Sequence, residues 1–157
     1  MFRQITPTST PSNQPVNSRS TRFYRHLSMW RERPFEFGKT DCVTFTTSWV
    51  DRELGTSFGD RIRSELKYSS HLGALRMISR RGGYQSLVEK FCGEGSAPQH
   101  GWETGDVALF INGYHDMTLG LLGEQLVYCP DDDGLSALSV ERLVLVWRLS
   151  CLKQPPQ

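Results

Sequence analysis

The fold of this chain is decided by the stretch Phe37-Gly38-Lys39-Thr40-Asp41-Cys42-Val43-Thr44-Phe45. A glycine and two residues that can cap a helix, Thr40 and Asp41, come directly before a cysteine. This order predicts that Cys42 opens a helix, where the helix dipole places about half a positive charge that favours a thiolate. Cys42 is therefore a candidate nucleophile. The competing interpretation is a buried cysteine that packs beside Phe45.

The pattern of apolar residues predicts helices first and strands afterwards. Four stretches have apolar residues at helical spacing and end at proline or glycine: residues 22–32, 41–54, 70–78 and 84–91. Residues 56–69 are polar and are expected to form a loop. Short apolar runs separated by turn residues predict strands at residues 106–111, 118–122, 125–129, 135–138 and 143–149. This order predicts an α+β fold, with N-terminal helices packed on a small antiparallel sheet.

The chain of 157 residues has room for one domain with one core. Residues 1–21 consist mostly of Ser, Thr, Pro, Asn and Gln, which cannot bury enough apolar surface to offset the entropy of ordering. We therefore expect a flexible arm over residues 1–21, a single domain over residues 22–152 and a short tail over residues 153–157.

Composition argues against several classes of function. The net charge of +1 gives no electrostatic reason to expect nucleic acid as a partner. No apolar run reaches the roughly 18 residues that a membrane-spanning helix needs. The four cysteines contain no C-x-x-C pair and the four histidines no H-x-x-x-H pair, so we expect neither a metal site nor another cofactor.

Charge is distributed unevenly along the chain. No Lys or Arg occurs from Phe91 to Glu141, a stretch that holds many acidic residues: Glu94, Glu103, Asp106, Asp116, Glu124, Asp131, Asp132, Asp133 and Glu141. The general interpretation of such a stretch is a solvated surface. The more specific one is a site that faces a cationic partner.

A nucleophilic cysteine needs a base within hydrogen-bonding reach. His115, between two predicted strands, is the best candidate, although an exposed loop histidine is the alternative interpretation. His26 is expected on the polar side of the first helix, and His71 and His100 in surface positions. Asp41, adjacent to the cysteine in sequence, is expected to cap the helix rather than to orient the base.

The order and spacing of several motifs resemble the NlpC-type papain-like cell-wall peptidases. The chain resembles more closely a small branch of that superfamily that is encoded by phages and prophages among tail genes. The resemblance covers about residues 22–149, and its motifs are Arg33-Pro34-Phe35-Glu36-Phe37-Gly38-Lys39-Thr40-Asp41-Cys42, Trp49-Val50, Gly73-Ala74-Leu75-Arg76, Arg80-Arg81-Gly82-Gly83, Gly105-Asp106-Val107, Leu119-Gly120-Leu121-Leu122-Gly123, Gly134-Leu135 and Val146-Trp147-Arg148.

The resemblance implies a papain-like α+β domain, in which a cysteine at a helix start packs against an antiparallel sheet that carries the catalytic histidine. The family activity is hydrolysis of amide bonds in peptidoglycan stem peptides. Asp41-Cys42 matches the Asp-Cys of the nucleophile motif, and Gly105-Asp106 matches the Gly-Asp that opens the first core strand. In active members a histidine immediately precedes the Val-Gly-Ile-type strand, but here Thr118 precedes Leu119-Gly120-Leu121.

Two functions follow as expectations. In the first, the chain is a degenerate member that serves as a structural or assembly component of the phage tail tip, and the arm 1–21 is a strap that orders on other tail proteins. In the second, it is an active cysteine endopeptidase that cleaves peptidoglycan stem peptides during genome entry, with Cys42 as nucleophile and His115 as base. Either function implies a protein that is made in the host cytoplasm and ends in the virion tail.

Overall fold

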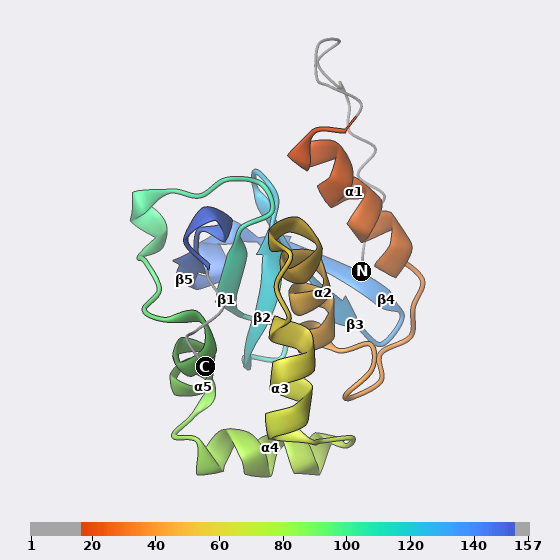
Figure 1. Ribbon diagram of the computed structural model, residues 1–157, viewed down its shortest axis with the longest axis vertical. Helices are drawn as coiled ribbons and strands as arrows, with labels where there is room; N and C mark the ends of the chain where they lie inside the picture. Colours follow the sequence, from red (N-terminus) through yellow and green to blue (C-terminus); the bar gives the residue numbers. More distant parts are fainter. Residues whose placement is uncertain (1–16, 153–157) are drawn as a thin grey trace.

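A computed structural model describes residues 17–152 and has an α+β architecture with five α-helices and one five-stranded antiparallel sheet (Figure 1). The expected α+β class and the expected order of helices before strands are confirmed. Residues 1–16 of the expected arm and the expected tail 153–157 lie outside the described residues.

The five helices fill the first part of the chain, and they are α1 (Arg19–Trp30), α2 (Cys42–Leu54), α3 (Phe58–Leu66), α4 (His71–Arg80) and α5 (Tyr84–Cys92). Helix α1 includes the last three residues of the expected arm, because Ser18 caps it by accepting a hydrogen bond from the Thr21 amide at 3.2 Å. A capping serine is inconspicuous in a segment that is rich in serine and threonine.

The expected loop over residues 56–69 is wrong, because α3 occupies most of it. Phe58, Ile62 and Leu66 recur every four residues and form one buried stripe on an otherwise polar helix. The helix start is capped from a distance, since the Asp51 carboxylate on α2 accepts the Phe58 and Gly59 amides at 2.8 and 2.9 Å. The N-cap residue Ser57 is inconspicuous in this polar stretch, and the contact with Asp51 is not visible in the local sequence.

The sheet has the strand order β4-β3-β2-β1-β5, and every neighbouring pair is antiparallel. Its strands are β1 (Val107–Ile111), β2 (Met117–Leu122), β3 (Leu126–Asp131), β4 (Gly134–Ser139) and β5 (Leu143–Trp147). Residues 17–152 also contain three short 3-10 helices: η1 (Pro98–His100), η2 (Val140–Arg142) and η3 (Leu149–Cys151). The hairpin predicted around Gly123-Glu124 is the connection between β2 and β3.

The main core lies between the sheet and helices α1 and α2. Helix α2 packs on β2 and β3, which are central in the sheet (Figure 1). The largest fully buried side chains here include Trp49, Phe23 and Phe45, and the ring centroids of Phe23 and Trp49 are 5.4 Å apart. A second cluster contains Phe110 and Val127 from β1 and β3. The start of α2 thus lies where a helix meets the middle of the sheet.

The expected position of His26 on the polar side of α1 is wrong. His26 has no exposed surface and lies among the rings of Trp30, Phe45 and Trp49. Its Nε2 donates a hydrogen bond to the Phe45 carbonyl at 3.0 Å, which fixes the neutral tautomer. Burial, with smaller contributions from nearby arginines, lowers the pKa of His26 to about 4.

This burial predicts a loss of stability in mild acid. The pKa of His26 is about 4 in the folded protein and near 6.5 in the unfolded chain. Between these pH values the unfolded chain therefore binds a proton at His26 and the folded protein does not. The contribution of His26 to the free energy of unfolding is greatest above pH 6.5 and decreases as the pH drops toward 4, by about 3 kcal/mol in total. Urea denaturation at pH 7.5 and at pH 4.5 measures this difference.

The matched control is His26→Phe, which keeps an aromatic ring in the cluster and removes the titrating group. The Phe45 carbonyl retains the Ser48 hydroxyl as a donor at 3.1 Å. We expect the variant to lose clearly less stability than the wild type between the two pH values. Equal losses in the two proteins would contradict the assignment.

Candidate functional site

Cys42 is the first residue of α2, and Asp41 is its N-cap, so the prediction that Cys42 opens a helix is confirmed. Asp41 has an extended backbone, and its Oδ1 accepts the Thr44 amide at 2.9 Å. The helix ends at Gly55 in a left-handed conformation, which also agrees with the sequence prediction. The geometry at the start of α2 is therefore fixed by the stretch that precedes it.

The second oxygen of Asp41 organises the loop before the helix. Asp41 Oδ2 accepts hydrogen bonds from the Gly38 amide at 2.7 Å and from the Tyr68 hydroxyl at 2.6 Å. Gly38 has a φ of +81°, and a Cβ there would lie 2.6 Å from the Tyr68 carbonyl oxygen. Both carboxylate oxygens are thus occupied, so Asp41 serves as a cap and an anchor rather than as a partner for a histidine.

The sheet side of the Cys42 environment is formed by β3. Cys42 Sγ lies 3.9 Å from the Pro130 carbonyl oxygen, and its half-buried side chain packs on the cluster that contains Cys129. The nearby Cys42 thiol, together with burial, raises the pKa of Cys129 well above its ordinary value. The sequence placed Cys129 near the end of the predicted hairpin, as one of several residues that could orient a base, and the register of β3 brings it to this place.

The position expected for the base holds Thr118, near the start of β2, and Tyr84 occupies the adjoining space. The Tyr84 hydroxyl accepts the Leu119 amide at 3.2 Å. Burial, followed by the neighbouring Cys42, raises the pKa of Tyr84 above its ordinary value. Tyr68 is similar, since burial and Asp41 raise its pKa. Both phenols are therefore neutral at ordinary pH.

His115 lies in the turn between β1 and β2. It is exposed, and its backbone has a left-handed φ of 65°. The turn is held by Asn112, whose carbonyl accepts the His115 amide at 3.1 Å and whose side chain accepts the amides of Tyr114 and Asp116. Within residues 17–152, no hydrogen bond joins the side chains of His115 and Cys42.

The other three histidines are also placed by the structure. His71 begins α4 and packs on Phe37, with 5.4 Å between ring centroids, so it lies beside the loop that leads to Cys42. His100 is exposed in η1, and His26 is buried under α1. None of these rings is hydrogen-bonded to Cys42 in the described part of the chain.

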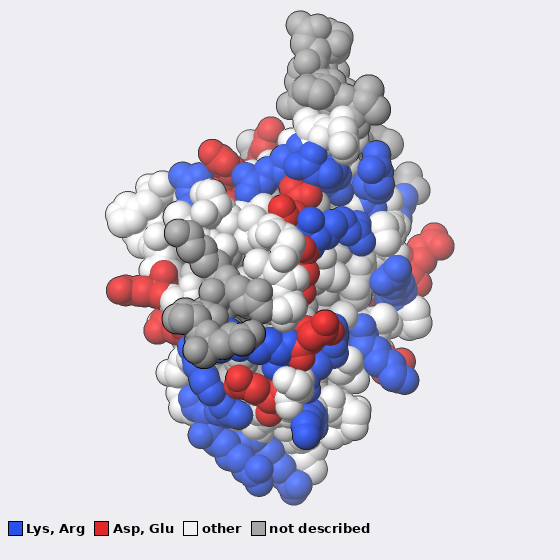
Figure 2. Space-filling model, in the orientation of Figure 1, with Lys and Arg blue, Asp and Glu red and all other residues white. Residues whose placement is uncertain are grey.

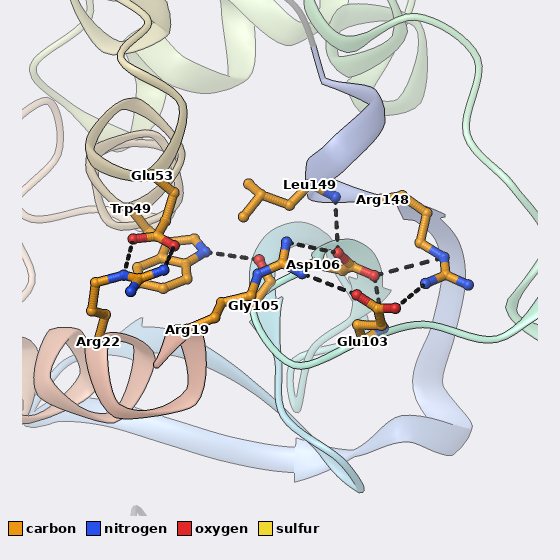
Figure 3. A network of polar contacts seen from close by, with 9 residues as sticks. All are labelled: Arg19, Arg22, Trp49, Glu53, Glu103, Gly105, Asp106, Arg148 and Leu149. Atoms are coloured by element: carbon orange, nitrogen blue, oxygen red, sulfur yellow. Dashed lines mark hydrogen bonds and ion pairs between the residues drawn. The ribbon is translucent and has the colours of Figure 1, made fainter. Parts of the chain in front are cut away.

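Gly105-Asp106, the second motif matched by the resemblance, forms a polar network that holds distant segments together (Figure 3). Asp106 is 1% exposed and accepts the amides of Leu149 and Glu103, each at 2.8 Å. Arg19 and Arg148 approach its two oxygens at 3.7 and 3.8 Å. Burial raises the pKa of Asp106, although these donors and cations act in the opposite direction. The motif is structural here.

The same junction contacts helix α2 through the preceding residue. The Trp49 indole donates a hydrogen bond to the Gly105 carbonyl at 2.8 Å (Figure 3). Arg22 of α1 and Glu53 of α2 form a two-point ion pair nearby, at 2.8 and 2.9 Å. The start of β1 is thereby tied to α1, α2 and the C-terminal η3.

Comparison with known protein families gives one match. The family described as "Domain of unknown function (DUF6950)" matches residues 16–149 of this chain. The chain belongs to the DUF6950 family. No curated protein matches it.

The extent of the DUF6950 match agrees with the architecture. It begins just before the α1 cap Ser18 and ends at Leu149, whose amide binds Asp106. The family unit therefore includes all five helices, the whole sheet and the Asp106 network.

Two further properties of this DUF6950 domain bear on its function. Across residues 17–152, no three His, Cys, Asp or Glu side chains are grouped as a metal ion would require. The described helices are all too short or too polar to cross a membrane.

Acidic and basic residues are distributed differently on the face drawn in Figure 2. Acidic side chains are scattered over this face, whereas Lys and Arg gather at its lower end, where α4 lies, and again in its upper part, around α1 (Figures 1 and 2). Glu103 and Asp106 of the acidic stretch are paired with arginines, and Asp131 accepts a hydrogen bond from Ser136 at 2.8 Å. These pairings favour the interpretation of the acidic stretch as ordinary surface and structural contacts.

Proposed function

We propose that this DUF6950 protein has an NlpC-type papain-like fold and acts as a non-catalytic structural component of a phage tail tip. The observation that carries this proposal is the residue at the place of the base. Thr118 stands there, and the neutral phenol of Tyr84 accepts the amide of the next residue, Leu119, at 3.2 Å.

The papain-like part of the proposal is supported by the position of Cys42. A cysteine opens a helix that packs on the two strands β2 and β3 of an antiparallel sheet. The strand that carries the base in active members corresponds to β2. The Tyr84 phenol lies near the start of this strand, and the neighbouring Cys42 contributes to its raised pKa. The arrangement of nucleophile helix and base strand thus follows the pattern that the resemblance implies.

The non-catalytic part rests on the chemistry around the thiol. General acid–base catalysis contributes about 10²–10⁴-fold to such reactions and needs a group that can take up a proton near neutral pH. Two phenols and a buried thiol near Cys42 each have a raised pKa, and the threonine at the position expected for the base cannot take up a proton near neutral pH. Within residues 17–152, none of these groups is suited to activate Cys42 and later to protonate a leaving group.

The second candidate function is the active cysteine endopeptidase. It is favoured by the half-buried thiol of Cys42 at the helix start, where backbone amides could hold an oxyanion. This function requires the His115 turn to rearrange so that the imidazole reaches Cys42. Three hydrogen bonds to Asn112 hold that turn in place and oppose such a movement.

As a tail component, the protein would bind other phage tail proteins, with the arm 1–21 as a strap, and peptidoglycan would be a partner only for the catalytic alternative. Its location would be the virion tail after synthesis in the host cytoplasm. Quantitative mass spectrometry of purified virions tests this directly. We expect the chain in mature particles, and we expect removal of residues 1–16 to reduce its incorporation. Absence of the chain from purified virions would overturn the assignment.

A further inference from the structure

A second thiol belongs to the apolar cluster on which Cys42 packs, and neither function proposed above gives this thiol a chemical step. Cys129 is on β3, is 5% exposed, and belongs to the apolar cluster on which Cys42 packs. The adjacent Pro130 carbonyl oxygen is 3.9 Å from Cys42 Sγ, so the β3 backbone is at contact distance from the start of α2. The half-buried thiol of Cys42 thus lies next to the segment of β3 that carries Cys129.

We propose that Cys42 and Cys129 are a paired modification site, at which a hydroperoxide oxidises Cys42 and Cys129 then closes an intramolecular disulfide. This inference is independent of the proposed function, because it needs only the two thiols and their contact.

The chemistry takes place in two balanced steps. The Cys42 thiolate attacks the terminal oxygen of the hydroperoxide, an S–O bond forms, the O–O bond breaks, and the released alkoxide or hydroxide takes the proton that Cys42 lost. The product is a sulfenic acid at Cys42. The Cys129 sulfur then attacks the Cys42 sulfur, the S–O bond breaks, and the hydroxyl group leaves as water with the Cys129 proton. Two thiols are oxidised, and one hydroperoxide is reduced.

Burial assigns the two roles. Cys42 is partly accessible and can meet the oxidant, whereas Cys129 is covered and can react only with a neighbour.

The two remaining cysteines are separated from this pair. Cys92, at the end of α5, packs with the α3–α5 cluster, and burial raises its pKa to about 12. Cys151 is exposed in η3. They therefore serve as internal controls for specificity.

The test is to treat the folded full-length chain with hydrogen peroxide, block free thiols with N-ethylmaleimide, and map disulfides by mass spectrometry without reduction. Trypsin alone leaves Cys92 and Cys129 in one peptide, because no Lys or Arg occurs between Lys90 and Arg142. A glutamate-specific protease added to trypsin cuts after Glu94 and Glu124 and separates them. We expect the Cys42–Cys129 peptide pair to become the major product, and to disappear on reduction.

Two variants complete the design. In Cys151→Ser the same linked pair should form, whereas in Cys129→Ser, Cys42 should accumulate as sulfinic or sulfonic acid instead. Protein unfolded in urea should lose the preference for this pair, which links the result to the fold. Irreversible oxidation of Cys42 in the wild type, or disulfides that pair Cys42 with Cys92, Cys151 or another molecule, would overturn the proposal.

Discussion

Replacing Asp106 by alanine is expected to cost the folded protein about 3 kcal/mol of unfolding free energy. The change leaves the amides of Leu149 and Glu103 without their acceptor, and each unsatisfied buried amide costs about 1–3 kcal/mol. It also removes the carboxylate that Arg19 and Arg148 approach in Figure 3. Chemical denaturation followed by circular dichroism measures the loss.

Glu103→Ala is the matched control for Asp106→Ala. Its carboxylate binds the same two arginines, at 3.1 and 3.5 Å, but is 66% exposed. Exposed ion pairs contribute at most about 1 kcal/mol, so this variant should be nearly as stable as the wild type. Asp106→Asn, which keeps one acceptor oxygen, should fall between the two. Equal stabilities for Asp106→Ala and Glu103→Ala would show that the network does not hold the termini of the domain together.

Replacing Trp49 by alanine is expected to cost about 4 kcal/mol, in the range found when a buried aromatic residue is removed. Trp49 has no exposed surface, packs on Phe23 with ring centroids 5.4 Å apart, and donates its indole N–H to Gly105 at 2.8 Å. Gly105 accommodates the indole closely, since a Cβ at that position would lie 2.8 Å from the Trp49 ring. Thermal and urea denaturation both report the effect.

Trp102 provides an internal comparison for this prediction. It also donates its indole N–H to a glycine carbonyl, that of Gly123 at 3.0 Å, but the ring is only partly buried. Trp102→Ala should therefore cost clearly less than Trp49→Ala. Trp49→Phe retains most of the apolar ring and should recover much of the loss. Similar costs for the two alanine variants would contradict the central place of Trp49 in the core.

Local signals predicted helix α2 well. Asp41 supplies a side-chain cap and Gly55 a left-handed stop, so both ends of the helix are marked in the sequence. Helix α3 is marked only by Ser57 at its N-cap, and its first amides are held by Asp51 on another helix. His26 was misplaced for a different reason. Its spacing from Phe23 and Trp30 follows the buried face, but histidine was counted as polar.

The candidate site was only half predictable. Cys42 and Asp41 were identified from their own neighbours in sequence, and the structure places both at the start of α2. Cys129 and Tyr84 come to the same place through strand register and helix packing, which no short motif encodes. The Asp106 network likewise depends on Leu149, 43 residues away along the chain. Contacts of this kind follow from the fold and not from local composition.

The central claim is that the scaffold around Cys42 does not hydrolyse peptides. The most direct measurement is the release of soluble muropeptides from purified peptidoglycan by the full-length chain, compared with Cys42→Ala, His115→Ala and the matched cysteine control Cys129→Ser. We expect the wild type to release no more soluble muropeptides than Cys42→Ala does. Release by the wild type and by Cys129→Ser that is lost in Cys42→Ala and in His115→Ala would contradict it and establish the peptidase.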